Sequence, residues 1–145
     1  MANSGVFPVY KNQFAVGATK ENATPIADME TFSVSIDNGV EEWHPFDTEG
    51  WVRRLMTAKG LTISVNGKRN IGDAGNDFVA GKAFVNGRDA EGYFCWTFPD
   101  GMKVEFDAAV YNIKNVGAGD STNVGPLEFE VLSNGKPTVT EAAAG

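Results

Sequence analysis

Short segments of the chain alternate apolar and polar residues, a period of two that predicts β-strands with one buried face. Residues 31–37 place Phe32, Val34 and Ile36 on one face and polar residues on the other. Similar segments follow at 40–46, 51–58, 61–65, 93–98, 102–112 and 127–131. We therefore expect an all-β fold, a β-sandwich or partly closed barrel of about six or seven strands.

Turn-forming residues separate these segments. Asn38-Gly39 predicts a hairpin turn, since both residue types tolerate a positive φ angle, and Asn66-Gly67 predicts another. Further turns or loops are expected at 47–50, 99–101 and 117–125.

Residues 77–86 lose the period of two and predict one short flanking α-helix. Asp77 is the expected N-cap, because its carboxylate can accept a hydrogen bond from a free N–H group of the first turn. Gly87 is the expected residue after the C-terminus. Gly81 weakens the helix, so we expect docking of Phe78 and Phe84 on the sheet to hold it.

The charge balance limits the classes of partner. The 145 residues include 19 Asp and Glu against 12 Lys and Arg, a formal net charge of -7. This balance argues against a protein that grips nucleic acid, although an acidic wall also lets DNA slide past without adsorbing. The chain has no apolar run long enough to span a bilayer and no export signal in its first ten residues, so we expect no membrane association and synthesis in a cytoplasm.

Residues able to carry catalysis are few. His44 is the single histidine, and no triad or dyad can be assembled around it from the sequence. Cys95 is the single cysteine, so no intrachain disulfide can form. Glu41 and Glu42 point to opposite faces of an extended strand. The acidic segment 72–77 lacks the spacing of a calcium loop and fits a helix-capping turn. We therefore expect no catalytic residue, no metal ligand and no cofactor.

Charge is segregated along the middle of the chain. The acids of 37–49 come without a basic residue among them, and the bases of 53–69 come without an acid. An acidic edge can meet a basic edge of the next copy in a polymer, and Trp and Arg are typical interface anchors. The alternative is an ordinary hairpin with its aromatic residues in the core. The expected inter-subunit residues are Glu41, Glu42, Trp43, His44, Phe46, Trp51, Arg53, Arg54 and Lys59.

Three blocks of sequence carry a resemblance to a known family. They are EEWHPFDTEGWVRRLMTAKGLTISVNGKRNIGDAGNDFVAGKAFVNG, YFCWTFPDGMKVEFDAAVYNI and GPLEFEVLSNGKPT, in that order. In this order they resemble the tail tube (major tail) proteins of phages with long non-contractile tails. The resemblance implies an arm at 1–27, a tail-tube β-sandwich domain at 28–140 and a flexible tail at 141–145.

The resemblance also implies a role for each part. Rings of subunits, usually hexameric, stack into a hollow tube through which the genome is ejected. The hairpin around 40–58 projects for ring-to-ring stacking, and the arm lies on a neighbouring subunit through Val6, Phe7, Val9 and Tyr10. The candidate acids of the lumen are Asp37, Asp47 and Glu49.

The resemblance thus implies a structural virion protein, not an enzyme, that is made in the host bacterial cytoplasm. Its expected partners are copies of itself and the tape-measure, tail-tip and tail-terminator proteins, and DNA passes without specific binding. The alternative function is a monomeric β-sandwich module that binds a ligand such as a carbohydrate on Trp43, Trp51 and Trp96. A small hydrolase built around His44 is a weaker third interpretation.

Overall fold

The computed structural model describes residues 5–141. Its strands are β1 (Gln13–Gly17), β2 (Thr24–Pro25), β3 (Met29–Trp43), β4 (Arg53–Lys68), β5 (Glu91–Thr97), β6 (Lys103–Asn115), β7 (Pro126–Leu132) and β8 (Thr138–Thr140). The helices are α1 (Ala74–Ala80) and the short 3-10 turns η1 (Val9–Lys11), η2 (Phe46–Thr48) and η3 (Gly87–Ala90).

All eight strands belong to one antiparallel sheet with the order β2-β1-β5-β6-β7-β4-β3, and β8 pairs with the start of β6. The sheet folds over so that its two ends meet through side chains: the rings of Phe14 in β1 and Phe32 in β3 lie 4.9 Å apart. No backbone pairing joins these ends in the described chain, so the sheet stays open. The expected mostly-β fold with a flanking helix is confirmed, as a folded sheet not closed into a barrel.

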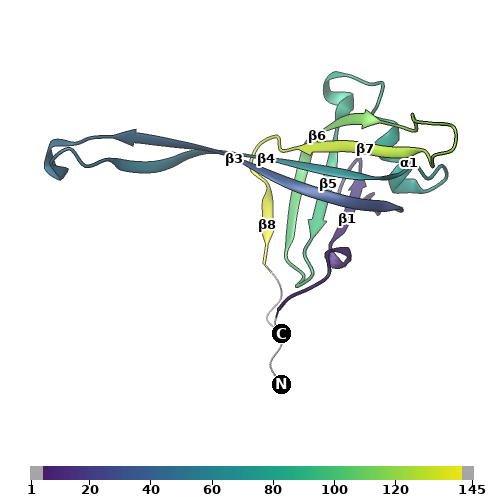
Figure 1. The fold of residues 1–145 in the computed structure, drawn as a ribbon, viewed down its shortest axis with the longest axis horizontal. Helices are drawn as coiled ribbons and strands as arrows, with labels where there is room; N and C mark the ends of the chain where they lie inside the picture. Colours follow the sequence, from purple (N-terminus) through teal and green to yellow (C-terminus); the bar gives the residue numbers. More distant parts are fainter. Residues whose placement is uncertain (1–4, 142–145) are drawn as a thin grey trace.

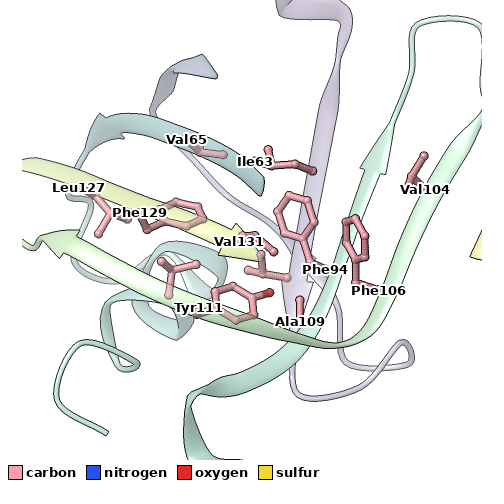
Figure 2. Packing of buried hydrophobic residues seen from close by; sticks show 12 residues of the cluster. Ile63, Val65, Phe94, Val104, Phe106, Ala109, Tyr111, Leu127, Phe129 and Val131 are labelled. Carbon is pink, nitrogen blue, oxygen red and sulfur yellow. The ribbon is translucent and has the colours of Figure 1, made fainter. Parts of the chain in front are cut away.

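The core fills the space inside the folded sheet (Figure 2). Phe94 of β5 and Phe129 of β7 are its largest fully buried side chains. The predicted alternations at 61–65 and 127–131 are confirmed, because Ile63, Val65, Leu127, Phe129 and Val131 are all buried.

Both Asn-Gly hairpin predictions were wrong. Asn38 and Gly39 lie inside β3, paired with Lys59 and Ala58 of β4, and Asn66-Gly67 lies inside β4. The ladder between β3 and β4 continues past both positions, with register shifts after Gly39 and between Met29 and Thr31, opposite Gly67 and Asn66, so a local turn tendency is overridden by pairing over more than a dozen residues. The actual turn is at the predicted segment 47–50, within the loop that contains η2.

The helix begins earlier than predicted. Asp73, not Asp77, is its N-cap and accepts a hydrogen bond from the N–H of Asn76. Asp77 instead pairs with Arg69, whose Nη1 lies 2.8 Å from Oδ1. Phe78 packs on the sheet as expected, edge-on to Tyr111, but Phe84 lies beyond the helix and is 91% exposed, so its expected docking was wrong.

Part of the expected arm belongs to the sheet. Residues 13–17 form β1, which pairs with β5, and Val16 is fully buried. Among the described residues, only 5–12 of the 1–27 segment therefore precede the sheet, and Val6, Phe7, Val9 and Tyr10 are exposed there. Residues 1–4, and 142–145 of the expected C-terminal tail, lie outside the described residues.

One buried carboxylate ties the N-terminal part of the chain to the sheet. Glu105 of β6 accepts a hydrogen bond from the Tyr93 hydroxyl, and Lys20 lies 3.3 Å from the same Glu105 oxygen. The bond from Tyr93, and then the Lys20 ammonium, hold the pKa of Glu105 below its ordinary value despite burial. The ionised form of Glu105 therefore stabilises the fold.

We predict that Glu105→Gln lowers the free energy of unfolding most at neutral pH. Because the folded-state pKa is depressed, the contribution of Glu105 is complete above the pKa of the unfolded chain and is lost as pH falls through the folded-state value. The stability gap between wild type and variant should thus be complete above about pH 5 and narrow as pH falls below the unfolded-chain pKa of about 4.3 in urea titrations. A gap that is constant over this range contradicts the assignment.

Candidate assembly interface

The hairpin of β3 and β4 projects far beyond the rest of the molecule (Figure 1). β7 pairs with β4 only from Thr62 to Lys68, so residues 37–60 form a ribbon of two strands with both edges unpaired. We call residues 37–60 the hairpin extension. Seven strand residues from Asp37 to Trp43, at about 3.3 Å each, carry its tip roughly 23 Å beyond the Ile36–Leu61 pair.

The tip of the extension is an ordered loop. The N–H of Glu49 donates to the Phe46 carbonyl at 3.1 Å, and the N–H of Trp51 donates to the Thr48 carbonyl at 3.0 Å. Glu49 has a φ angle of 55°, a left-handed conformation that is uncommon for a residue other than glycine. The backbone thus holds Phe46 and Trp51 in solvent, 103% and 77% exposed.

Apolar side chains are exposed along the whole extension. Leu55 is 60% and Met56 44% exposed, and no residue of the extension belongs to the buried core of the described chain. A two-stranded ribbon is marginally stable alone in water, and a contiguous exposed apolar surface marks an interaction site. The alternative in which the aromatic residues of this hairpin fill the core is therefore wrong for Phe46 and Trp51.

Some of the segregated charges meet within the hairpin. Glu42 and Arg54 face each other across the two strands and form a salt bridge, which lowers the pKa of Glu42. The Arg53 guanidinium lies over the Trp43 ring, 5.6 Å from its centroid. An acidic strand thus faces a basic strand of the same chain, and the sequence pattern is partly explained without a neighbour.

All nine predicted inter-subunit residues lie on this extension and all are exposed: Glu41, Glu42, Trp43, His44, Phe46, Trp51, Arg53, Arg54 and Lys59. Two of the candidate lumen acids, Asp47 and Glu49, lie at its tip, and Asp37 lies at its base. Sequence reasoning missed Leu55 and Met56. Their signal was the strand at 51–58, which carries apolar and charged residues on both faces.

The tryptophan platform does not form. Trp96 of β5 stacks on Phe98 with ring centroids 4.1 Å apart and contacts Phe32 edge-on. Phe32 precedes Trp43 by eleven residues of one extended strand, about 35 Å. Trp96 therefore lies far from the indoles of the extension, and a ligand cannot contact all of them.

His44 offers no catalytic arrangement. It is exposed near the tip of the hairpin extension, between Trp43 and Pro45. In residues 5–141, no hydrogen bond joins its imidazole to an acid or a nucleophile. The weaker hydrolase interpretation gains no support from this geometry.

A groove lies where the extension leaves the domain. Its walls come from Met56 to Leu61 of β4, from Ile36 of β3, and from the segment 133–139 that leads into β8. It is open to solvent and encloses about 750 Å³. Sequence reasoning missed it, since it depends on β8 folding back beside β6.

Comparisons with known proteins show which solved structures share this fold. No protein-family model matches the chain, and no curated protein sequence matches it. Solved structures do: a chain of the tail of an empty GTA particle with C6 symmetry, at 18% identity and a TM-score of 0.71, covers 94% of this chain and all of its own length. The virion of a native gene transfer agent particle gives 19% identity and a TM-score of 0.70, with coverage of 94% and 100%.

Tubes of contractile systems share the fold more distantly. The cap that terminates the tube of the anti-feeding prophage has 13% identity and a TM-score of 0.63, covering 98% of this chain and 95% of its own. The sheath-tube complex of an extracellular contractile injection system has 13% identity and a TM-score of 0.60, with coverage of 94% and 93%. Within residues 5–141, no helix combines the length and hydropathy that a membrane crossing requires. The resemblance seen in the sequence is thus borne out in the fold, which is that of the chains of phage-like tails and tubes.

Proposed function

We propose that this chain is the subunit of a phage-like tail tube, a structural protein that assembles with copies of itself and has no catalytic activity. The observation that carries the proposal is the hairpin extension, an ordered ribbon with exposed aromatic side chains that contributes no residue to the core of the described chain. A surface of this kind needs a partner. A long binding loop for a foreign ligand would need only the tip, whereas here the apolar surface continues to Met56 and Ile36 near the base.

The finer features of the proposal are rings of six subunits, a non-contractile tail and passage of DNA during ejection. The six-fold symmetry is supported by the C6 tail that shares this fold. The fold does not distinguish contractile from non-contractile tails, because tubes of contractile injection systems have a similar fold. The non-contractile tail is therefore proposed from the sequence resemblance alone. The site of action is the virion, after synthesis in the host cytoplasm.

The lumen wall of such a tube needs a surface that does not adsorb DNA. The outer face of β3, β4 and β7 carries small polar residues and acids, with Ser33 opposite Ser64 and Ser64 opposite Glu130. Asp37 continues this face toward the extension. We propose that this face lines the lumen, because its carboxylates repel a polyanion and its hydroxyls carry no positive charge that would hold one.

The other proposed partners are the tape-measure, tail-tip and tail-terminator proteins. A cap and a terminator of contractile systems share the fold of this chain. A terminator of the same fold can dock on the end of a tube as another subunit does.

Electron microscopy of concentrated purified protein tests the proposal: rings or tubes support it, and monomers at every concentration and with every tail-tip extract contradict it.

We predict that Arg53→Glu/Arg54→Glu leaves the fold intact and stops tube growth. Reversal breaks the Arg54–Glu42 salt bridge and leaves six acids and no lysine or arginine between residues 41 and 58, while both positions are exposed and outside the core. Circular dichroism should be unchanged and micrographs should show no tubes. Arg53→Lys/Arg54→Lys, which keeps the charges, is the matched control and should assemble. Normal tubes from the reversed variant show that this surface is not at a subunit contact.

A further inference from the structure

Two surfaces at opposite ends of the hairpin extension have complementary character. The first is the groove at its base, which we call the base groove. Its apolar residues are Ile36, Met56, Leu61, Pro137 and Val139. Ile36 is 56% and Val139 55% exposed, so apolar side chains face water on both walls.

The charged groups of the base groove are ammonium groups. Lys59 and Lys136 both line it. Lys59 donates to the neutral Oδ1 of Asn38, and in residues 5–141 neither ammonium forms an ion pair. None of the described residues that line the groove is an acid, and Asp37 of β3 faces Gly60 on the side of the ribbon away from Ile36 and Leu61. The groove therefore presents apolar walls with a positive rim.

The second surface is the tip, which has the opposite charge. Phe46 and Trp51 are its apolar side chains, and Asp47 and Glu49 lie between them in the sequence. Neither carboxylate forms an ion pair anywhere in the described part of the chain. The hydrogen-bonded turn and the left-handed Glu49 fix this loop before any partner arrives, which lowers the entropy cost of binding.

We propose that the tip of one chain seats in the base groove of a second copy, with Phe46 and Trp51 against the apolar walls and Asp47 and Glu49 facing Lys59 and Lys136. The inference rests on the proposed function and names the contact through which the extension acts. The paired ribbon holds the tip away from its own groove, because about 10 Å of strand separates the tip from Met56 and about 23 Å separates it from the Ile36–Leu61 pair. The contact is therefore head-to-tail and repeats from copy to copy, as a tube requires.

This contact gives the tip acids a different role from the one that the sequence suggested. Asp47 and Glu49 were candidate lumen acids, but acids paired with lysines of a neighbour are not free to face DNA. Asp37 remains on the polar face of the sheet and keeps that candidate role. The base groove also explains why Lys59 lies among the exposed residues of the extension.

Disulfide trapping tests the contact in assembled protein. Phe46→Cys combined with Val139→Cys should give a ladder of linked dimers, trimers and longer species on mild oxidation, because a disulfide needs Cα atoms within about 7 Å. The native Cys95 is buried and should not react, so the unmodified chain gives no ladder. Phe46→Cys with Phe84→Cys is the matched control, since Phe84 is 91% exposed and follows α1 in the chain, and α1 lies on the side of the domain away from the hairpin extension (Figure 1). It should give no ladder.

Charge exchange is the second measurement. Lys59→Glu/Lys136→Glu should abolish tubes, Asp47→Lys/Glu49→Lys should abolish them too, and the four changes in one chain should restore them. A ladder and this rescue support the contact. The inference is overturned if the unmodified chain forms tubes, the Phe46→Cys/Val139→Cys variant gives no ladder, and the chain with all four charge changes forms no tubes. In that case the proposed function stands. If the unmodified chain forms no assembly, the proposed function itself fails.

Discussion

Asn76→Ala is expected to lower the free energy of unfolding by about 3 kcal/mol and the Tm by about 10 °C. Asn76 is fully buried at the start of α1. Its Oδ1 accepts bonds from Arg69 at 2.8 Å and from the N–H of Asn70 at 3.0 Å. Its Nδ2 donates to the carbonyls of Ala27 at 3.2 Å and Lys68 at 2.9 Å. Alanine leaves all of these partners without the amide in a site closed to water.

Urea titration followed by circular dichroism measures the effect. Asn134→Ala is the matched control, because Asn134 lies in the exposed turn after β7 and its loss should change the free energy of unfolding by less than about 0.5 kcal/mol. Asn76→Asp should also destabilise the fold, since it keeps the acceptor but loses both donors. Equal stabilities for Asn76→Ala and Asn134→Ala would falsify the view that Asn76 holds α1 against β4 and the segment before β3.

The sequence identified the core strands but not their ends. The period of two at Ile63 and Val65 or at Phe129 and Val131 follows directly from burial of one face. The ends of β3 and β4 depend instead on how long the two strands stay paired. Pairing with a partner strand can keep an Asn-Gly dipeptide extended, so that no turn forms there. Gly67 illustrates the reason: a side chain there would come within 2.3 Å of the Asp28 carbonyl, so glycine serves close packing.

The helix start was misplaced for a similar reason. The polar segment 70–77 contains several residues able to cap a helix, and sequence alone does not rank them. Asp73 is selected because its carboxylate also accepts a hydrogen bond from the N–H of Ala27, 46 residues away in the sequence. Gly75 then lets the helix approach the Pro25 carbonyl, which a Cβ would meet at 2.2 Å. Contacts this distant leave no periodic signal.

The candidate interface was more predictable than these ends. Aromatic residues next to separated charges, on a strand with no dry face, favoured an exposed hairpin, and only the structure excluded the alternative in which Phe46 and Trp51 fill the core. The base groove had no such signal, since it joins residues 36, 56–61 and 133–139. Composition thus identifies the part of an assembly surface that is contiguous in the chain and misses the receptor formed by distant segments.

Removing the hairpin extension is expected to abolish assembly while the domain keeps its stability. Replacing residues 39–58 by Asn-Gly joins Asn38 to Lys59, which already face each other across the ladder, through a two-residue turn. The buried core of the described chain takes no residue from 37–60, so the free energy of unfolding should change by less than about 1 kcal/mol. Micrographs should show no tubes. Tubes of normal length from this variant contradict any role of the extension in assembly.

The shortened chain should also act on the unmodified one. It loses the tip but keeps Ile36, Leu61 and the segment 133–139, which form most of the base groove. It can therefore accept a tip from an intact chain and offers none in return, so a minor fraction mixed into intact protein should shorten the tubes. Lys59→Glu/Lys136→Glu added to the shortened chain removes the positive rim and should relieve this effect. Shortening that persists after this change means that the intact chain meets the shortened one through another surface.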